Sequence, residues 1–431
     1  PFFLWIDLYD PHSDHDPPGP LAERFAQDPY QGEVAHVDSQ IGRLLEGLRS
    51  RGLEGATHVV LAGSHGEGLG DHQETGHGIY VYEGTIRVPL IVAPAGSRSG
   101  RVVRRVVGLI DVAPTILELL SARIPASMAG RSLVPLAGPA GAAGEKSAPA
   151  PRGRAYIVEA WQPWAAYGWS PMFAVIEGRR KVILGRRLEA FDLESDPAEE
   201  RPIDPVPGWA RDLAALAPSA SLPPGPRPVS ERTRRKVLKG VRALALPWDN
   251  SPICLEKQNW PDPRDLTSLN DSLFRARLAG DHGAAGTAST IAYEVLEQDP
   301  ANYTALELIL FLMVRNRRHE MILEPFELFQ CNYPFRGAPY HLLGHYFERS
   351  DPEKAEGALQ IYRLLEPWSE EPEYDLAVHY AGRGAIDLAF RHLKRSIELG
   401  AEDLEFIRGD GRLAALRKDP RFADLVGPVG P

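Results

Sequence analysis

Short apolar runs alternate with amphipathic stretches through the first part of the chain. Residues 2–8, 58–62 and 88–93 are nearly continuous apolar runs, which predict buried strands. Residues 31–51 place apolar side chains at steps of three and four, which predicts a helix. Residues 111–120 show the same spacing after an aspartate suited to an N-cap. This alternation predicts an α/β domain whose sheet is largely parallel.

Beyond a low-complexity stretch at 138–151, which we expect to be a loop, the apolar runs become shorter and are separated by tight turns. The predicted strands are 155–159, 173–177, 181–184 and 190–193. They predict a small antiparallel sheet appended to the first domain. We expect Lys181 to be a solvated surface group of this sheet. The expected role of Trp161, Trp164 and Trp169 is packing against it.

From about residue 266 the pattern is helical and repeats. Helix-breaking residues recur 33 or 34 positions apart, at Pro300, Pro334, Pro367 and Gly400. We expect helix 303–314 to pair with 320–329, and helix 355–365 to pair with 385–399. A period near 34 with two helices per unit is typical of tetratricopeptide repeats, and an irregular helical domain is the alternative. Stacked repeats present a concave groove, so we expect a protein or peptide partner.

These patterns give an α/β protein with four parts. They are the first α/β part at 1–137, the small antiparallel sheet at 155–204, a Pro-rich linker at 205–262 and all-α helical repeats at 263–431. The length of 431 residues agrees with about three domains.

Composition excludes several classes of function. The net charge of -10 gives no electrostatic reason to expect nucleic acid as a partner. The two cysteines, Cys254 and Cys331, are too few and too far apart for a disulfide framework or a thiolate metal site. No apolar run approaches the roughly 20 residues of a membrane-spanning helix. The chain begins with Pro1 inside an apolar run, so we expect preceding sequence to be missing.

Candidate chemistry gathers in two loops that follow predicted strands. The first contains His12 and His15, and the second, at 63–78, contains His65, His72 and His77 among glycines and carboxylates. Ligands of open α/β sheets bind outside the carboxyl ends of strands. Imidazoles and carboxylates are metal ligands, and imidazole titrates near neutral pH. From spacing alone these loops favour a metal-dependent hydrolase, with ordinary solvated histidines as the alternative.

Several ordered blocks resemble a known family. PFFLWIDLYDPHSDHDPP, EVAHVDSQIGRLLEGLRSRGL and HVVLAGSHGEGLGDHQETGHGIYVYEGTIRVPL are similar to the second half of a sulfatase catalytic domain. The sulfatases belong to the alkaline-phosphatase superfamily. YGWSPMFAVIEGRRKVILGRRLEAFDLESDPAEE resembles the small C-terminal sheet of the same family. The resemblance covers about residues 1–204 and implies a partial alkaline-phosphatase-like sheet.

The resemblance implies roles for individual residues. His12 matches the active-site histidine near the leaving-group oxygen, and His77 stands where the family has a Lys or His that contacts the sulfate oxygens. Ser64 and His65 stand where the family has Asp-Asn or Asp-His, with the Asp a calcium ligand. Ser64 departs from that pattern and offers only a neutral oxygen, so we expect a weakened Ca2+ site held through His65 or a neighbour. Glu67 is a candidate outer partner of this metal.

Sulfatases attack with a formylglycine made from Cys or Ser in a C/S-x-P-x-R motif, and these 431 residues contain no such motif. We therefore expect the nucleophile upstream of this chain, and the chain alone to be inactive.

The leading interpretation is a hydrolase of sulfate monoesters acting on a small molecule or a glycan. The first alternative is a phosphodiesterase or phosphonate hydrolase of the same superfamily. The second is a degenerate sulfatase-like protein that acts through its helical repeats. The compartment stays open, with an extracytoplasmic location as one alternative.

Overall fold

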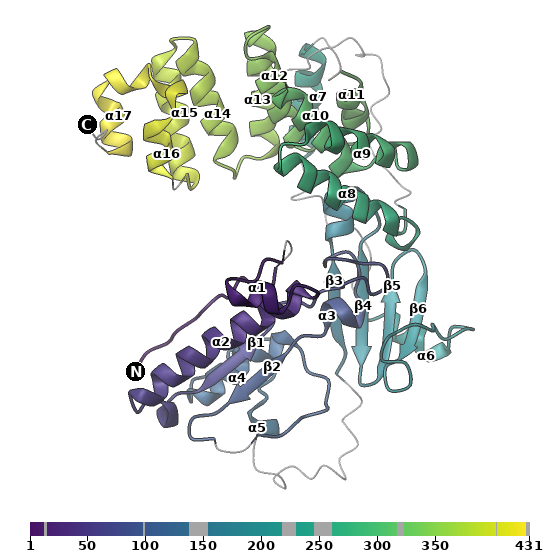
Figure 1. Cartoon of the computed structure of the whole chain (residues 1–431). Helices are drawn as coiled ribbons and strands as arrows, with labels where there is room; N and C mark the ends of the chain where they lie inside the picture. The colour runs from purple at the N-terminus through teal and green to yellow at the C-terminus, as the bar shows by residue number, and fades with distance from the viewer. Residues whose placement is uncertain are drawn as a thin grey trace. The chain divides into compact units, whose positions relative to one another are not determined.

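The computed structural model describes residues 1–12, 15–97, 100–137, 154–217, 230–244, 261–316, 323–333, 335–401 and 403–427. The low-complexity stretch at 138–151, Cys254 and Pro334 lie outside the described residues. The chain forms two compact units (Figure 1). The first contains Pro1–Ala160 and Met172–Ala217, and the second contains Trp161–Pro171 and Pro218–Pro431.

The first unit begins with the short helix α1 (Pro20–Arg24) and the long helix α2 (Pro29–Ser50). The α2 helix confirms the predicted one but begins two residues earlier, because Asp28 accepts a hydrogen bond from the Gln31 amide and Pro29 occupies the first turn. Strands β1 (Val59–Ala62) and β2 (Leu90–Ala93) confirm two of the three predicted runs.

The predicted parallel arrangement of these strands is wrong, because β1 and β2 pair antiparallel, with Val59 opposite Ala93. A parallel pair needs a crossover connection, usually a helix. The only helix between these two strands is the four-residue α3 (Glu83–Ile86).

The strand predicted at residues 2–8 is also wrong for the described structure. These residues pair with no other described strand, and Phe3 and Trp5 are 70% and 75% exposed. A strand exists only through its ladder of hydrogen bonds to a neighbour, so an apolar run without a described neighbour is left extended and exposed.

The helix predicted at 111–120 is α4 (Val112–Leu119), preceded by the 3-10 turn η2 (Leu109–Asp111). Asp111 precedes α4 but does not cap it, because its side chain is used elsewhere. It accepts hydrogen bonds from the Arg131 amide at 2.8 Å and the Tyr156 hydroxyl at 2.8 Å, and it pairs with Arg154 at 2.8 Å. This buried carboxylate therefore joins the start of α4 to the small sheet.

The small antiparallel sheet is confirmed, with order β3-β4-β5-β6 (Figure 1). Its strands are β3 (Tyr156–Ala160), β4 (Met172–Glu177), β5 (Arg180–Leu184) and β6 (Leu188–Asp192). Val175, Val182 and Ala190 form its core with Ala210 and Leu213 of helix α6 (Gly208–Ala214). This face of the sheet is buried because α6 covers it.

Lys181 in β5 is fully buried, so the prediction of a solvated group is wrong. Its Nζ lies 2.7 Å from Glu199 Oε1 and 3.2 Å from Glu83 Oε1. The Glu199 carboxylate also accepts the Glu83 amide at 2.6 Å. Two carboxylates from segments distant in the sequence compensate the charge of the buried ammonium. The local sequence pattern around Lys181 does not reveal these partners.

The remaining short elements of the first unit are η1 (Glu54–Ala56) and α5 (Val134–Ala137).

The second unit is helical. The helices of the second unit are α7 (Glu231–Ala243), α8 (Thr267–Asp281), α9 (Ala285–Gln298), α10 (Tyr303–Arg315), α11 (Leu323–Asn332), α12 (Ala338–Phe347), α13 (Pro352–Leu365), α14 (Glu371–Gly382), α15 (Ile386–Leu399), α16 (Leu404–Gly409) and α17 (Pro420–Val426). Short 3-10 turns are η4 (Pro263–Asp265), η6 (Gly411–Leu413) and η7 (Leu416–Lys418).

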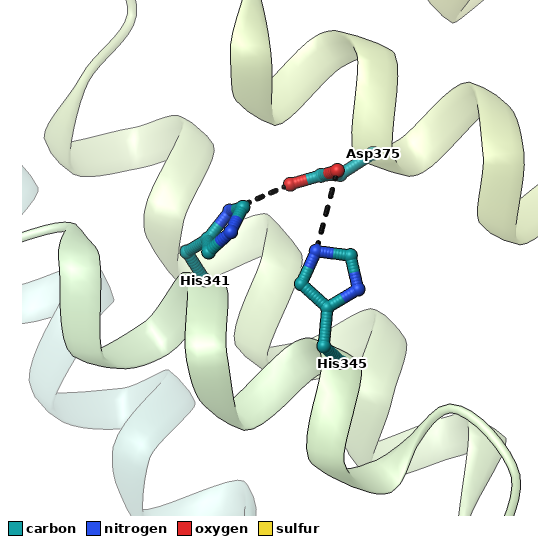
Figure 2. A group of neighbouring side chains, drawn as sticks. All are labelled: His341, His345 and Asp375. Atoms are coloured by element: carbon teal, nitrogen blue, oxygen red, sulfur yellow. Dashed lines mark ion pairs between the residues drawn. The ribbon is translucent and has the colours of Figure 1, made fainter. Parts of the chain in front are cut away.

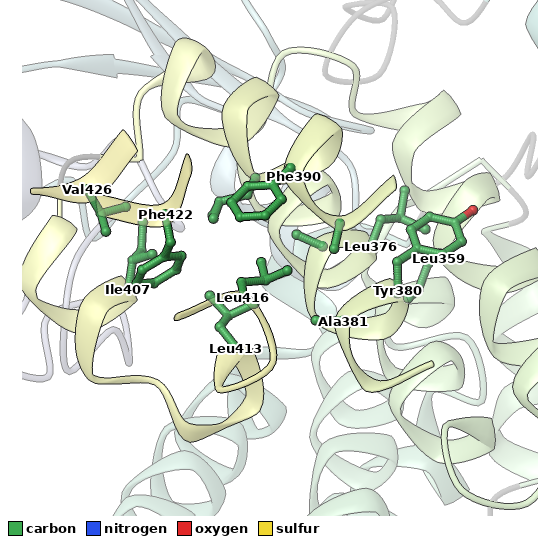
Figure 3. Close-up of a cluster of buried hydrophobic side chains, with 13 residues drawn as sticks. Leu359, Leu376, Tyr380, Ala381, Phe390, Ile407, Leu413, Leu416, Phe422 and Val426 are labelled. Carbon is green, nitrogen blue, oxygen red and sulfur yellow. The ribbon is translucent and has the colours of Figure 1, made fainter. Parts of the chain in front are cut away.

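Helix packing corrects one predicted pair. Helices α10 and α11 pack together as expected, but α13 packs on α12, and α15 packs on α14. The helix α14 lies between the two segments that we expected to pair. From Leu359 of α13 to Val426 of α17, a continuous apolar cluster fills the interior (Figure 3). Membership of the tetratricopeptide class remains a prediction.

Trp169 belongs to the helical unit, and its packing against the small sheet stays a prediction. It lies in the β3–β4 connection, Trp161–Pro171, which includes the π-helical turn η3 (Pro163–Tyr167) and belongs to the helical unit. Its indole is fully buried and donates a hydrogen bond to Asp299 Oδ2 at 2.8 Å.

Two helices, α6 and α7, fall in the stretch 205–262 predicted as a linker. The domain boundaries at 1–137, 155–204, 205–262 and 263–431 otherwise remain predictions.

Candidate functional site

Glu33 organises the first histidine loop from the buried face of α2. Its Oε2 accepts hydrogen bonds from the His15 imidazole Nδ1 at 2.7 Å and from the His12 amide at 3.3 Å. Its Oε1 accepts a hydrogen bond from the Asp16 amide at 2.7 Å. The residue is 4% exposed, so these donors compensate its carboxylate. The His12 ring itself stacks on Tyr9, with centroids 4.3 Å apart.

The second loop, 63–78, follows β1 and folds back on itself through backbone hydrogen bonds. The Gly68 amide donates to the Gly76 carbonyl and the Gly70 amide donates to the Glu74 carbonyl, both at 2.8 Å. A Cβ at Gly68 would lie 2.1 Å from the Glu74 carbonyl oxygen, so only glycine fits there. The buried Glu74 carboxylate accepts the Ile79 and Tyr80 amides at 2.8 and 3.2 Å, which fixes the end of the loop.

This fold brings His65, Glu67 and His77 together. The His77 Nδ1 lies 3.1 Å from Glu67 Oε2, whose side chain is 5% exposed. The hydrogen bond and the negative charge of Glu67 raise the pKa of His77 above its ordinary value, although partial burial opposes them. The rings of His65 and His77 stack with centroids 3.9 Å apart. The arrangement holds a readily protonated imidazole with Nδ1 engaged and Nε2 left for an external oxygen.

Tyr30 of α2 connects the two loops. Its ring meets the His15 ring edge-on, with centroids 5.3 Å apart. Burial, followed by the charge of Glu67, raises the pKa of the Tyr30 hydroxyl. Because Tyr30 contacts His15 of the first loop and lies within range of the charge of Glu67 in the second, the two histidine loops lie close together.

The residues predicted to hold calcium do not make a calcium site by themselves. Ser64 and His65 are exposed, and His65 Nδ1 lies 2.9 Å from the Gly66 carbonyl oxygen. Ca2+ takes six to eight oxygen ligands, whereas this pair supplies one hydroxyl and one imidazole. Within the described ranges, no group of three His, Cys, Asp or Glu side chains gathers around Ser64 and His65.

His72 has a structural role in the same loop. Its ring stacks on Tyr82 with centroids 3.6 Å apart, and its Nε2 donates to the Glu199 carbonyl oxygen at 3.1 Å. It therefore ties the loop to the segment that follows β6.

Glu33 and Tyr30 were missed from the sequence, and both organise the site. The one available signal was that a carboxylate, Glu33, stands among the apolar positions of an otherwise amphipathic helix. A charge on a buried helix face needs partners, but their identity depends on a loop about 20 residues away.

Two family models match the region that carries this site. The model described as Sulfatase matches residues 1–122, and the model described as N-sulphoglucosamine sulphohydrolase, C-terminal, matches residues 76–207. Together they cover the histidine loops, the β1–β2 pair and the small sheet. Residues 1–207 therefore match models of the sulfatase family.

Named relatives agree with this assignment. The chain is 34% identical over 107 residues to Arylsulfatase K of Xenopus laevis, which is 25% of this chain and 20% of that protein. It is 29% identical over 272 residues to Steryl-sulfatase of Mus musculus, which is 54% of this chain and 44% of that protein. The chain thus spans from about a fifth to less than half of the length of these relatives.

A solved structure described as a 2-O GAG sulfatase is 22% identical and aligns over 57% of this chain and 47% of its own, with a TM-score of 0.38. In the described part of the chain, no helix combines the length and the apolar character that a membrane crossing requires.

Proposed function

We propose that the protein carrying this chain hydrolyses sulfate monoesters, with the loops at the end of β1 forming part of its active site. The observation that carries the proposal is the buried Glu67 carboxylate holding His77 beneath His65. The sulfatase-family match over residues 1–207 supports it.

His77 suits the binding of a tetrahedral anion. Glu67 accepts the Nδ1 proton of His77, which orients the ring and stabilises the imidazolium form. The cationic ring then offers Nε2–H to a sulfate oxygen. This charge-assisted hydrogen bond strengthens as negative charge accumulates on the ester oxygens in the transition state.

His12 suits proton delivery to the departing alkoxide. Glu33 fixes the backbone of the loop by accepting the His12 amide, and Tyr9 supports the ring by stacking. A positioned imidazole can donate a proton to a departing oxygen, and such a group contributes about 10²- to 10⁴-fold to the rate. The attacking nucleophile would come from a C/S-x-P-x-R segment, which these 431 residues lack.

The test uses the complete protein with aryl esters of sulfate and of phosphate. We expect turnover of the sulfate esters; preferential turnover of phosphate or phosphonate esters would instead establish the phosphohydrolase alternative. His12→Ala should slow esters of poor leaving groups far more than the 4-nitrophenyl ester, because only poor leaving groups need protonation. His282→Gln, an exposed position after α8, is the matched control and should change neither rate.

Ser64 favours the second candidate function, a degenerate sulfatase-like protein that acts through its helical unit. The exposed hydroxyl replaces an anionic ligand, and no cluster of described ligands compensates for it. If the complete protein turned over neither class of ester and bound Ca2+ only after Ser64→Asp, this candidate would replace the first.

A further inference from the structure

Two histidines and an aspartate meet between helices of the second unit (Figure 2). His341 and His345 are one turn apart on α12, so their side chains lie on the same face of that helix. Asp375 projects from α14 and faces both. One carboxylate oxygen lies 2.8 Å from His341 Nδ1, and the other lies 3.5 Å from His345 Nε2.

We propose that His341, His345 and Asp375 form a binding site for a divalent transition-metal ion of the Zn2+ class. Each residue offers one ligand atom, and the three atoms lie within 4.8 Å of one another. At Zn–N and Zn–O distances near 2.0–2.1 Å, tetrahedral ligand atoms lie about 3.3 Å apart. Each imidazole lies 2.8 or 3.5 Å from a different oxygen of the Asp375 carboxylate, so binding one ion requires the side chains to rotate until one atom of each residue faces it.

The state of the polar atoms supports an ion rather than a simple hydrogen-bonded pair. His341 Nδ1 and Asp375 Oδ2 are both buried and form an ion pair at 2.8 Å, but neither makes a well-directed hydrogen bond to a described residue. Buried polar atoms without partners are costly, and an ion between them would satisfy both at once.

The surroundings add negative charge. Glu366 and Glu371 are near enough for their charges to act on His341, and the Tyr362 hydroxyl donates to Glu371 Oε2 at 2.7 Å. Two cations oppose these charges: Arg336 acts on Glu366, and Arg412 acts on Asp375 but is also paired with Asp410 at 2.7 Å.

The chemistry of the donors selects the metal. Imidazole nitrogen suits Zn2+, Co2+, Ni2+ and Fe2+, whereas Ca2+ and Mg2+ prefer oxygen. No fourth His, Cys, Asp or Glu among the described residues joins the group, so a water or an external ligand would complete the coordination. Because α12 pairs with α13 while α14 pairs with α15, the ion would join two successive helix pairs.

The test is a Zn2+ titration of the full chain against a competing chelator, with Co2+ absorption as the spectroscopic probe. We expect one site whose occupancy raises the melting temperature, and visible Co2+ bands with nitrogen and oxygen donors. His345→Gln and Asp375→Asn should each lower the affinity for Zn2+. Because these residues are direct ligands, the loss should exceed the about 10- to 100-fold that removal of a residue supporting a ligand costs. The exposed His282→Gln should bind as the unchanged chain does.

A second measurement needs no variant. Diethylpyrocarbonate modifies free imidazole nitrogens, and mass spectrometry locates the modified histidines. Zn2+ should protect His341 and His345 selectively, while His282 stays reactive. Equal modification of His341 and His345 with and without Zn2+, or unchanged Zn2+ affinity in Asp375→Asn, would overturn the proposal.

Discussion

The buried ammonium of Lys181 offers the sharpest test of how the small sheet is held to its surroundings. Lys181 is fully buried, and so is the side chain of its partner Glu199. A second carboxylate, Glu83, completes the pairing from a more exposed position. Burial raises the pKa of Glu199, and Lys181 opposes that rise, so the carboxylate depends on its cation to remain ionised.

Lys181→Met keeps the length and the apolar stem of the side chain but removes the charge. It leaves Glu199 buried without its cation, and breaking a buried pair in this way costs about 3–5 kcal/mol. Adding Glu199→Gln removes the uncompensated charge while an amide oxygen can still accept the Glu83 amide. We therefore expect the double variant to recover more than half of the loss.

Native-state hydrogen exchange of the β5 amides measures this locally, so the second unit does not enter the result. The control is Arg179→Met, which removes solvent-exposed ion pairs with Asp192 and Glu194 in the same sheet. It should cost less than about 1 kcal/mol. A loss below 1 kcal/mol for Lys181→Met, or a double variant no more stable than the single one, would refute the reasoning.

Three further predictions concern the histidine loop. Glu67→Gln should lower the pKa of His77, measured by NMR titration of the imidazole, because the hydrogen bond and charge that raise it are weakened; an unchanged pKa would exclude Glu67 as the cause. Burial raises the pKa of Glu74 from 4.5 to about 7 in the folded state, so the folded protein binds this proton more tightly than the unfolded chain does. The free energy of unfolding should therefore fall as the pH rises from about 4.5 to 7, by up to about 1.4 kcal/mol per pH unit. Denaturation of Glu74→Gln across that range should show a shallower slope, and an equal slope would contradict the assignment. Ser64→Asp should strengthen Ca2+ binding at least about tenfold by calorimetry, because it supplies an anionic oxygen; tight binding by the unchanged chain would show that Ser64 is no defect.

Much of the local structure follows from the sequence. The spacing of apolar residues after Asp28 determines α2, and the short runs between tight turns determine β3 to β6. The glycines of the loop after β1 also indicate a tight loop from the sequence alone, since the close backbone approach at Gly68 leaves no room for a Cβ. Each of these features depends on interactions within a few residues or across one turn.

The sequence by itself also assembled the candidate chemistry, because His65 and His77 lie in one loop whose ordered blocks resemble a sulfatase. His341 and His345 stand four positions apart in the sequence, but the sequence led to no prediction for them. Only the tertiary structure brought Asp375 to them, Glu33 to the His12 loop, and Glu199 to a lysine that the pattern assigned to the surface. The same limit explains the antiparallel pairing of β1 and β2 and the unpaired run at 2–8. Strand partners and the counter-charges of buried groups come from distant segments, and the energy that selects them exists only once those segments are packed together.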